Sequence, residues 1–139
     1  DESLAAMRYA GVVPVVLPGT SFFLGIAHAN ARKMIDAGLP LALGTDFNPG
    51  SCMIESLPLI MNIACCQLRL LPNEALVACT ANAAAALDLH TTTGAIEPGF
   101  DADLLILDVP SVDGWMYAIG QPAIRTVIKR GRVIHTNAI

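Results

Sequence analysis

The chain has 139 residues, the length of one ordinary domain, and 54% of them are apolar while only 14% are charged. Its net charge is −4, and the only basic cluster, Lys129-Arg130-Gly131-Arg132, is too small to neutralise a run of phosphates, so we expect no nucleic-acid partner. No apolar run approaches the roughly 18–20 residues that a membrane-spanning helix needs, so we expect no membrane segment. The apolar excess predicts instead that more protein covers part of the surface.

The first part of the chain predicts a helix followed by a strand. Residues 3–9 carry apolar side chains at helical spacing, and Gly11 follows as a C-terminal stop. The wholly apolar run at residues 12–17 predicts a strand that is buried on both faces. Pro18 and Gly19 are expected to end this strand.

The next segment predicts a second helix and a second strand. Asn30 is the expected N-cap, because its side-chain oxygen can accept a free backbone N–H of the first turn, and Gly38 stops the helix. Residues 41–44 predict a buried strand that runs into Asp46. Strand, helix and strand at this spacing predict a βαβ unit with parallel strands, so the fold class is α/β.

Helices are predicted through the middle of the chain. Residues 54–70 are largely apolar and long enough for one helix. Pro72 begins another, since proline suits the first helical turn. Thr80 is the expected N-cap of a third helix over residues 81–87.

After about residue 90, turns and strands replace helices. Glu97-Pro98-Gly99 is a strong turn signal, with proline at the second position of the turn and glycine at the third. Residues 102–108 predict a strand, and residues 127–134 predict a hairpin. The chain is therefore predicted to hold two regions, 1–90 and 91–139.

The cysteines and the first residues bear on the cellular compartment. The four cysteines lack the spacings of a disulfide framework or a C-x-x-C pair, and the acidic start of the chain lacks the form of a signal peptide. Buried free thiols in a reducing cytoplasm are therefore expected. The cysteines are Cys52, Cys65, Cys66 and Cys79.

Asp46 is the candidate functional residue. It ends a predicted buried strand and is followed by a Pro-Gly loop. In parallel α/β folds, functional sites lie at the carboxyl ends of strands, and a buried carboxylate there is costly unless a cation or hydrogen bonds compensate it. Metal binding or proton transfer is one interpretation, and a local cap of a helix or turn is the other. The residue pattern alone leaves both open.

The stretch Thr45-Asp46-Phe47-Asn48-Pro49-Gly50 resembles the TDxNPG motif of imidazolonepropionases, in the amidohydrolase superfamily. The similarity runs nearly end to end. It implies the C-terminal part of a TIM-like (β/α)8 barrel over residues 1–90, followed by strands of a small accessory β-domain over residues 91–139. Further similar segments are Leu17-Pro18-Gly19, Ala37–Leu43, Pro72–Leu76, Thr80–Ala84 and Gly94–Leu104.

The resemblance also implies roles for individual residues. Asp46 matches the aspartate that ligates the catalytic metal, zinc or iron, and handles the proton of the attacking water. Asn48, Gly50 and Ser51 match loop positions that contact the small-molecule substrate. The family reaction opens the ring of 4-imidazolone-5-propanoate to N-formimidoyl-L-glutamate in histidine breakdown. A cytoplasmic homodimer is implied, and the family's histidine ligands are expected before Asp1.

The three histidines of the chain do not supply those ligands, since no pair has metal-binding spacing. His28, His90 and His135 are expected to be ordinary surface or cap residues, with His28 on the side where a site would open. Two alternatives remain open. The chain could belong to another amidohydrolase, such as a deaminase or a dihydroorotase-like hydrolase, or be a non-catalytic remnant that binds a partner. In isolation we expect it to be inactive and poorly soluble.

Overall fold

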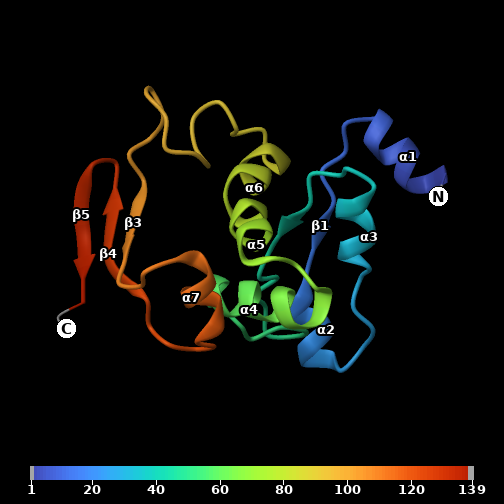
Figure 1. The fold of residues 1–139 in the computed structure, drawn as a ribbon, viewed down its shortest axis with the longest axis horizontal. Coiled ribbons are helices and arrows are strands. Elements are labelled where there is room, and N and C mark those ends of the chain that lie inside the picture. The colour runs from blue at the N-terminus through green and yellow to red at the C-terminus, as the bar shows by residue number, and fades with distance from the viewer. Residues whose placement is uncertain (1, 138–139) are drawn as a thin grey trace.

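The computed structural model describes residues 2–137 as an α/β structure with two separate sheets (Figure 1). A parallel pair of strands lies on one side of a group of helices, and an antiparallel sheet lies on the other. The elements in chain order are α1 (Glu2–Tyr9), β1 (Val15–Val16), α2 (Pro18–Leu24), α3 (Ala31–Asp36), β2 (Ala42–Leu43), α4 (Leu57–Leu68), α5 (Pro72–Cys79), α6 (Ala81–Ala86), β3 (Leu104–Leu107), α7 (Val112–Tyr117), β4 (Ile124–Lys129) and β5 (Arg132–Thr136).

Strands β1 and β2 form the predicted parallel pair, with Val16 opposite Leu43. The βαβ prediction is confirmed, but the regular strands are shorter than the apolar runs that contain them. Burial on both faces is wrong for β1: Val16 is 5% exposed whereas Val15 is 51% exposed. Successive side chains of a strand point to opposite faces, and no described element covers the face of Val15.

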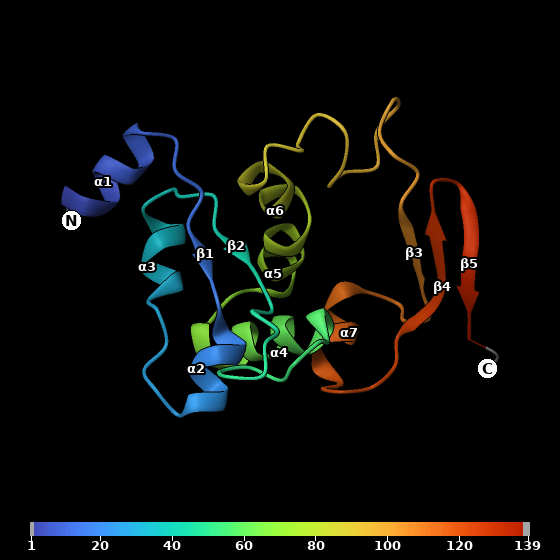
Figure 2. The ribbon, with the colours of Figure 1, turned by 180° about the vertical axis from the view of Figure 1, so that it is seen from behind.

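Helix α2 begins where the sequence predicted only the end of a strand. Pro18 occupies the first turn, where its missing N–H costs no hydrogen bond. Gly25 ends the helix with a φ of +64° and donates its N–H to the carbonyl of Phe22. In both views α2 and α4 lie together at the carboxyl end of β1 (Figures 1 and 2), so this unpredicted helix borders the candidate site.

The predicted helix starts are mostly confirmed. The Asn30 side chain accepts the N–H of Lys33 at 3.1 Å, as an N-cap should. Helix α4 begins later than expected, after Ser56, whose hydroxyl accepts a backbone N–H of the first turn. Thr80 does precede α6, but its capping role is wrong, because its hydroxyl donates backwards to the carbonyl of Leu76 at 2.8 Å.

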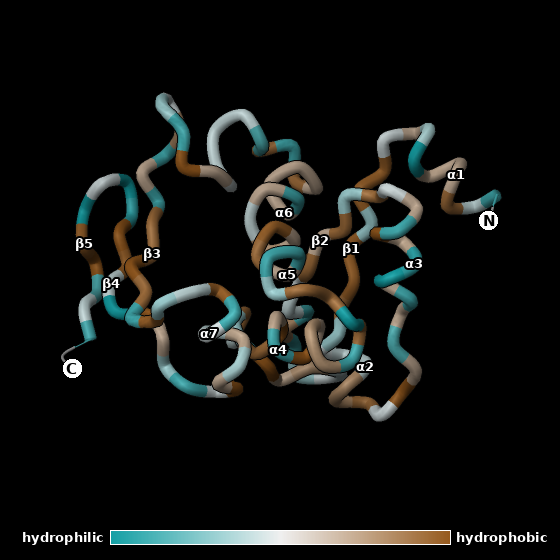
Figure 3. Tube along the Cα trace, viewed as in Figure 1, coloured by the Kyte–Doolittle hydropathy of each residue, from teal (hydrophilic) through white to brown (hydrophobic). Residues whose placement is uncertain are grey.

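The core joins the parallel strands to the helices. Leu41, Leu43 and Ile60 are buried in a single cluster, which Trp115 and Met116 of α7 also enter. Burying such side chains contributes roughly 1.5–3 kcal/mol each, less the entropy of ordering them. Figure 3 shows apolar residues in β1 on one side of the molecule and in β3 and β4 on the other.

The antiparallel sheet has the order β3-β4-β5. The predicted hairpin is confirmed: Lys129 pairs with Arg132 around Arg130 and Gly131, which have φ values of +49° and +73°. Two positive φ values in succession give the turn that matches the twist of paired strands. The turn at residues 97–100 is also confirmed, since the N–H of Phe100 donates to the carbonyl of Glu97 at 3.2 Å.

Helix α7, which the sequence did not predict, returns to the helical group between β3 and β4. It packs against α4 and α5, and the buried side-chain amide of Asn62 donates to the carbonyl of Met116 at 3.0 Å. The region after residue 90 therefore contributes a helix to the first region's core as well as a separate sheet. The boundary near residue 90 stays a prediction.

Within residues 2–137, no helix has the length and apolar character to cross a bilayer. The four cysteines are free thiols. Cys52 is fully buried, whereas Cys66 lies on the outer side of α4 and is exposed, so the expectation of burial is wrong for Cys66.

Candidate functional site

Asp46 lies just beyond the carboxyl end of β2, in partly buried surroundings. Its backbone has a φ of +50°, the left-handed region, which aspartate enters more readily than most residues. The chain turns sharply at this point and leaves the strand. The Asp46 side chain is thus presented at the end of the parallel pair, where sites of parallel α/β folds form.

The Asp46 carboxylate accepts a hydrogen bond from α2, the helix that follows the neighbouring strand β1. Thr20, in the first turns of α2, donates its hydroxyl to Asp46 Oδ2 at 2.7 Å, across 26 positions of sequence. Thr20 lies in α2, which follows β1, and Asp46 lies in the loop that follows β2, so parallel pairing brings the two side chains to the same edge. The interpretation of Asp46 as a purely local cap finds no support in this contact.

The other carboxylate oxygen, Oδ1, makes no hydrogen bond within residues 2–137. This atom is not fully buried, so water or a cation can reach it. The Oδ1 atom is therefore the group at this strand end that could bind a divalent cation or accept a proton.

The loop after Asp46 is organised by Asn48. Its Nδ2 donates to the Asp46 carbonyl at 2.7 Å and to Ser51 Oγ at 2.9 Å. Its Oδ1 accepts the backbone N–H groups of Gly50 at 2.8 Å and Ser51 at 2.9 Å. A pair of backbone hydrogen bonds between Asn48 and Cys52 closes the loop.

These bonds bear on the predicted substrate contacts Asn48, Gly50 and Ser51. The structure brings the three residues together beside Asp46, and their polar groups bond mainly to one another. The Asn48 amide is engaged at both its oxygen and its nitrogen. These bonds fix the conformation of the loop.

The three histidines do not form a metal site with Asp46 in the described residues. His28 occupies the connection between α2 and α3, and its Nδ1 is buried without a hydrogen-bond partner. His90 Nδ1 lies 3.8 Å from the Asp88 carboxylate, and His135 Nε2 lies 2.9 Å from Asn137 Oδ1. In the described part of the chain, no three His, Cys, Asp or Glu side chains gather to hold a metal.

Asp46 fits a divalent metal as one ligand of a larger set. It is an oriented carboxylate with one oxygen bound by Thr20 and the other open. Zinc sites take three or four donors, so the remaining donors would have to come from beyond residues 2–137. Thr20 was missed by sequence reasoning. The available signal was a hydroxyl residue a few positions after a strand that neighbours the strand of Asp46.

Comparison with known proteins decides the family. The sequence pattern of the amidohydrolase family matches residues 11–136, nearly the whole chain. The chain belongs to the amidohydrolase family. This amidohydrolase is 50% identical over 134 residues to an imidazolonepropionase of Geobacillus sp. (strain WCH70), covering 96% of the chain and 32% of that protein. It is 48% identical to one of Geobacillus kaustophilus (strain HTA426), with the same coverage.

The solved structures agree on the fold. An adenosine deaminase of Xanthomonas campestris with bound zinc superimposes with a TM-score of 0.86 at 23% identity, over 95% of the chain and 34% of that protein. The resemblance to imidazolonepropionases and the α/β class are confirmed. The amidohydrolase chain spans about a third of the length of the curated relatives it matches.

Proposed function

We propose that this chain is the C-terminal part of a metal-dependent hydrolase that opens the ring of 4-imidazolone-5-propanoate, giving N-formimidoyl-L-glutamate in histidine degradation. The observation that carries the proposal is the Asp46 carboxylate, held by Thr20 with Oδ1 open, in a chain half identical to imidazolonepropionases. A deaminase or a dihydroorotase-like hydrolase remains the second candidate, because the fold is also that of an adenosine deaminase.

The proposed architecture assigns residues 1–90 to the last strands and helices of a (β/α)8 barrel. The parallel pairing of β1 with β2 supports this, as does the position of Asp46 at the carboxyl end of a strand. Residues 91–139 would supply strands of an accessory β-domain, which the antiparallel sheet β3-β4-β5 supports. The family match and the superposition agree with a barrel of this kind.

The residues of this chain would act through Asp46. Zinc or iron, when bound, supplies the positive charge that makes a water molecule acidic. The Asp46 carboxylate would offer that ion an anionic ligand through Oδ1 and would accept the proton of the attacking water. The water oxygen forms a bond to the ring carbonyl carbon, and the ring C–N bond breaks. Asp46 then returns the proton to the departing nitrogen.

The loop after Asp46 would form one wall of the substrate pocket. Asn48, Gly50 and Ser51 are the proposed contacts, and the hydrogen bonds among them preorganise the loop before substrate arrives. A cytoplasmic homodimer is proposed on the same similarity. Exposed apolar side chains such as Phe22 and Phe23 support burial of this surface against further protein.

The full-length protein that contains this chain, loaded with zinc or iron, tests the proposal. We expect it to consume 4-imidazolone-5-propanoate and to leave guanine and dihydroorotate unchanged. Preference for either of the latter would favour the second candidate. Absence of turnover of all three substrates would favour a non-catalytic binding protein.

Replacement of Asp46 assigns the activity to this site. Asp46→Asn should lower kcat by roughly 10²–10⁴-fold, because the proton acceptor is lost. Asp88→Asn is the matched control: Asp88 also has a positive φ, of +58°, but its side chain is 97% exposed on the surface. Equal activity of the two variants would contradict the role of Asp46.

A further inference from the structure

Residues Pro18, Gly19 and Thr20 form the first turn of α2, beside the loop that follows β2. A Cβ atom on Gly19 would lie 2.6 Å from Ile60 Cδ1 and 2.9 Å from Cys52 Sγ. Only glycine therefore lets the first turn of α2 approach this closely to α4 and to the loop after Asp46. The close approach places the next residue, Thr20, against the Asp46 carboxylate.

The Thr20 hydroxyl donates its hydrogen bond to that carboxylate. The hydroxyl has one proton to donate, and it donates it to Asp46 Oδ2 at 2.7 Å. A threonine in a helix commonly bonds a nearby backbone carbonyl, as Thr80 does with Leu76. Thr20 instead reaches across to the neighbouring strand's end.

This bond distinguishes the two carboxylate oxygens of Asp46. An untethered carboxylate could rotate and present either oxygen, or both, to a cation. With Oδ2 engaged by Thr20, Oδ1 is the oxygen that has no hydrogen-bond partner within residues 2–137, and the bond restricts rotation of the carboxylate. Hydrogen bonds of this kind orient metal ligands and tune their basicity.

We propose that Thr20 is the positioning residue of Asp46: its hydroxyl holds Oδ2 and so orients the carboxylate with Oδ1 toward the metal. This rests on the proposed role of Asp46. In this role Thr20 acts through Asp46, and the close packing at Gly19 brings Thr20 within hydrogen-bond distance of the Asp46 carboxylate.

Three variants of the full-length protein test the inference. Thr20→Val removes the hydroxyl and keeps the shape, and Thr20→Ser keeps the hydroxyl. As a control, Thr80→Val removes the hydroxyl hydrogen bond from Thr80, between α5 and α6, to the Leu76 carbonyl. The metal Kd, measured by chelator competition without substrate, is the first readout. The separate values of kcat and KM are the second.

Thr20→Val should weaken metal binding by about 10–100-fold and lower kcat more than it raises KM. Thr20→Ser and Thr80→Val should stay near the wild type in both. Wild-type metal affinity in Thr20→Val would overturn the inference. So would an equal loss in Thr20→Ser, because the methyl group rather than the hydroxyl would then matter.

The inference and the proposed function fail separately. If the wild-type protein left 4-imidazolone-5-propanoate unchanged while Thr20→Val still weakened metal binding, the function would be wrong and the positioning role would stand. If the wild type turned the substrate over and Thr20→Val matched it in metal Kd and kcat, the positioning role alone would be wrong.

Discussion

At Gly19, one added methyl group would collide with two buried side chains at once. The nearest atoms, Ile60 Cδ1 and Cys52 Sγ, belong to residues with no exposed surface, so neither can swing into solvent. Gly19→Ala in the full-length protein should therefore lower the free energy of unfolding by about 1–3 kcal/mol, the usual cost of overpacking. Chemical denaturation measures it.

The Ile60→Val substitution controls this prediction, because it removes the closest atom, Cδ1. Alone it should cost about 0.5–1.5 kcal/mol, but combined with Gly19→Ala it should restore part of the lost stability. If the losses of stability in the two single variants simply added in the double variant, atoms other than Ile60 Cδ1 would be relieving the collision.

Some features of single residues could be predicted from the sequence and others could not. Asp46 was predictable as a candidate, because a carboxylate that ends an apolar strand stands out locally. Its bond to Thr20 was not predictable, because it joins positions 26 apart and depends on the pairing of β1 with β2. The exposure of Val15 escaped prediction for a similar reason: an apolar run does not say how many of its faces are covered.

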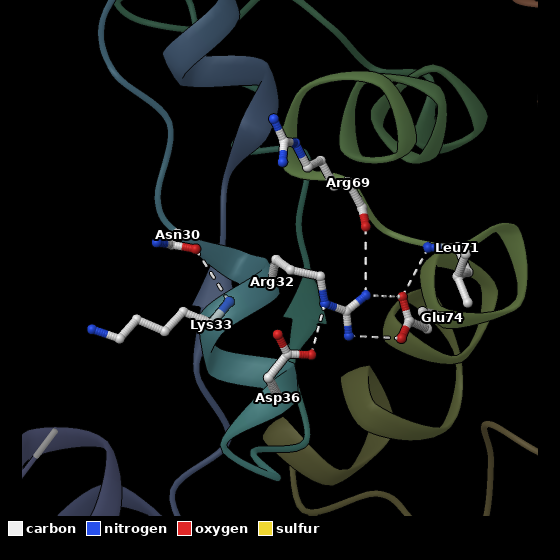
Figure 4. Close-up of polar contacts among 7 residues, drawn as sticks. All are labelled: Asn30, Arg32, Lys33, Asp36, Arg69, Leu71 and Glu74. Carbon is white, nitrogen blue, oxygen red and sulfur yellow. Dashed lines mark hydrogen bonds and ion pairs between the residues drawn. The ribbon is translucent and has the colours of Figure 1, made fainter.

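At the scale of elements, one carboxylate joins α3 to α5. Glu74 accepts two hydrogen bonds from the Arg32 guanidinium, at 2.7 Å and 2.9 Å, and a third from the N–H of Leu71 at 2.8 Å (Figure 4). The bond from Leu71 helps to cap the N-terminus of α5, since Leu71, the N-cap residue, has no side-chain oxygen that could accept a backbone N–H. Asp36 accepts from Arg32 Nε at 3.0 Å and orients the guanidinium.

This joint predicts a pH dependence. The hydrogen bond from Arg32, with help from that of Leu71, holds the pKa of Glu74 below its ordinary value against the opposing effect of burial. A lowered folded pKa gives stability that is full above the unfolded value of about 4.3 and fades as the pH falls through the folded value. Glu74→Gln should therefore unfold more readily than the wild type at neutral pH and approach it in acid.

Thermal unfolding at several pH values checks this prediction. The same substitution made on top of Arg32→Gln should lose most of its pH dependence, because the partner is gone. The prediction would be wrong if the difference in stability between wild type and Glu74→Gln stayed constant down to acid pH. The contact between Arg32 and Glu74 would then depend on shape and not on charge.

Elements with a local signal were the ones that sequence reasoning found. Asn30, Pro72 and the hairpin turn act within a few residues of themselves, so their helices and strands were predicted correctly. Helix α2 was missed because Pro18-Gly19 reads as a break, although proline suits a first turn and this glycine serves packing. Helix α7 was missed because its six residues include Gly114 and its stability comes from packing on α4 and α5.

At the scale of the whole molecule, the described chain provides a strand-end carboxylate and its support, but no full set of metal donors within residues 2–137. It covers 32% of the length of a curated imidazolonepropionase. Exposed apolar residues on α2 and β5, including Phe22 and Ile134, agree with burial against further protein. In the proposed function, the activity belongs to a longer protein to which this chain contributes Asp46.

Anomalous diffraction from crystals of the zinc-loaded full-length protein tests that claim most directly, because it locates the metal without reference to activity. We expect a zinc ion about 2.0–2.2 Å from Asp46 Oδ1, with Thr20 still bonded to Oδ2. A zinc ion bound entirely by other side chains, with the Asp46 carboxylate turned away from it, would contradict the account.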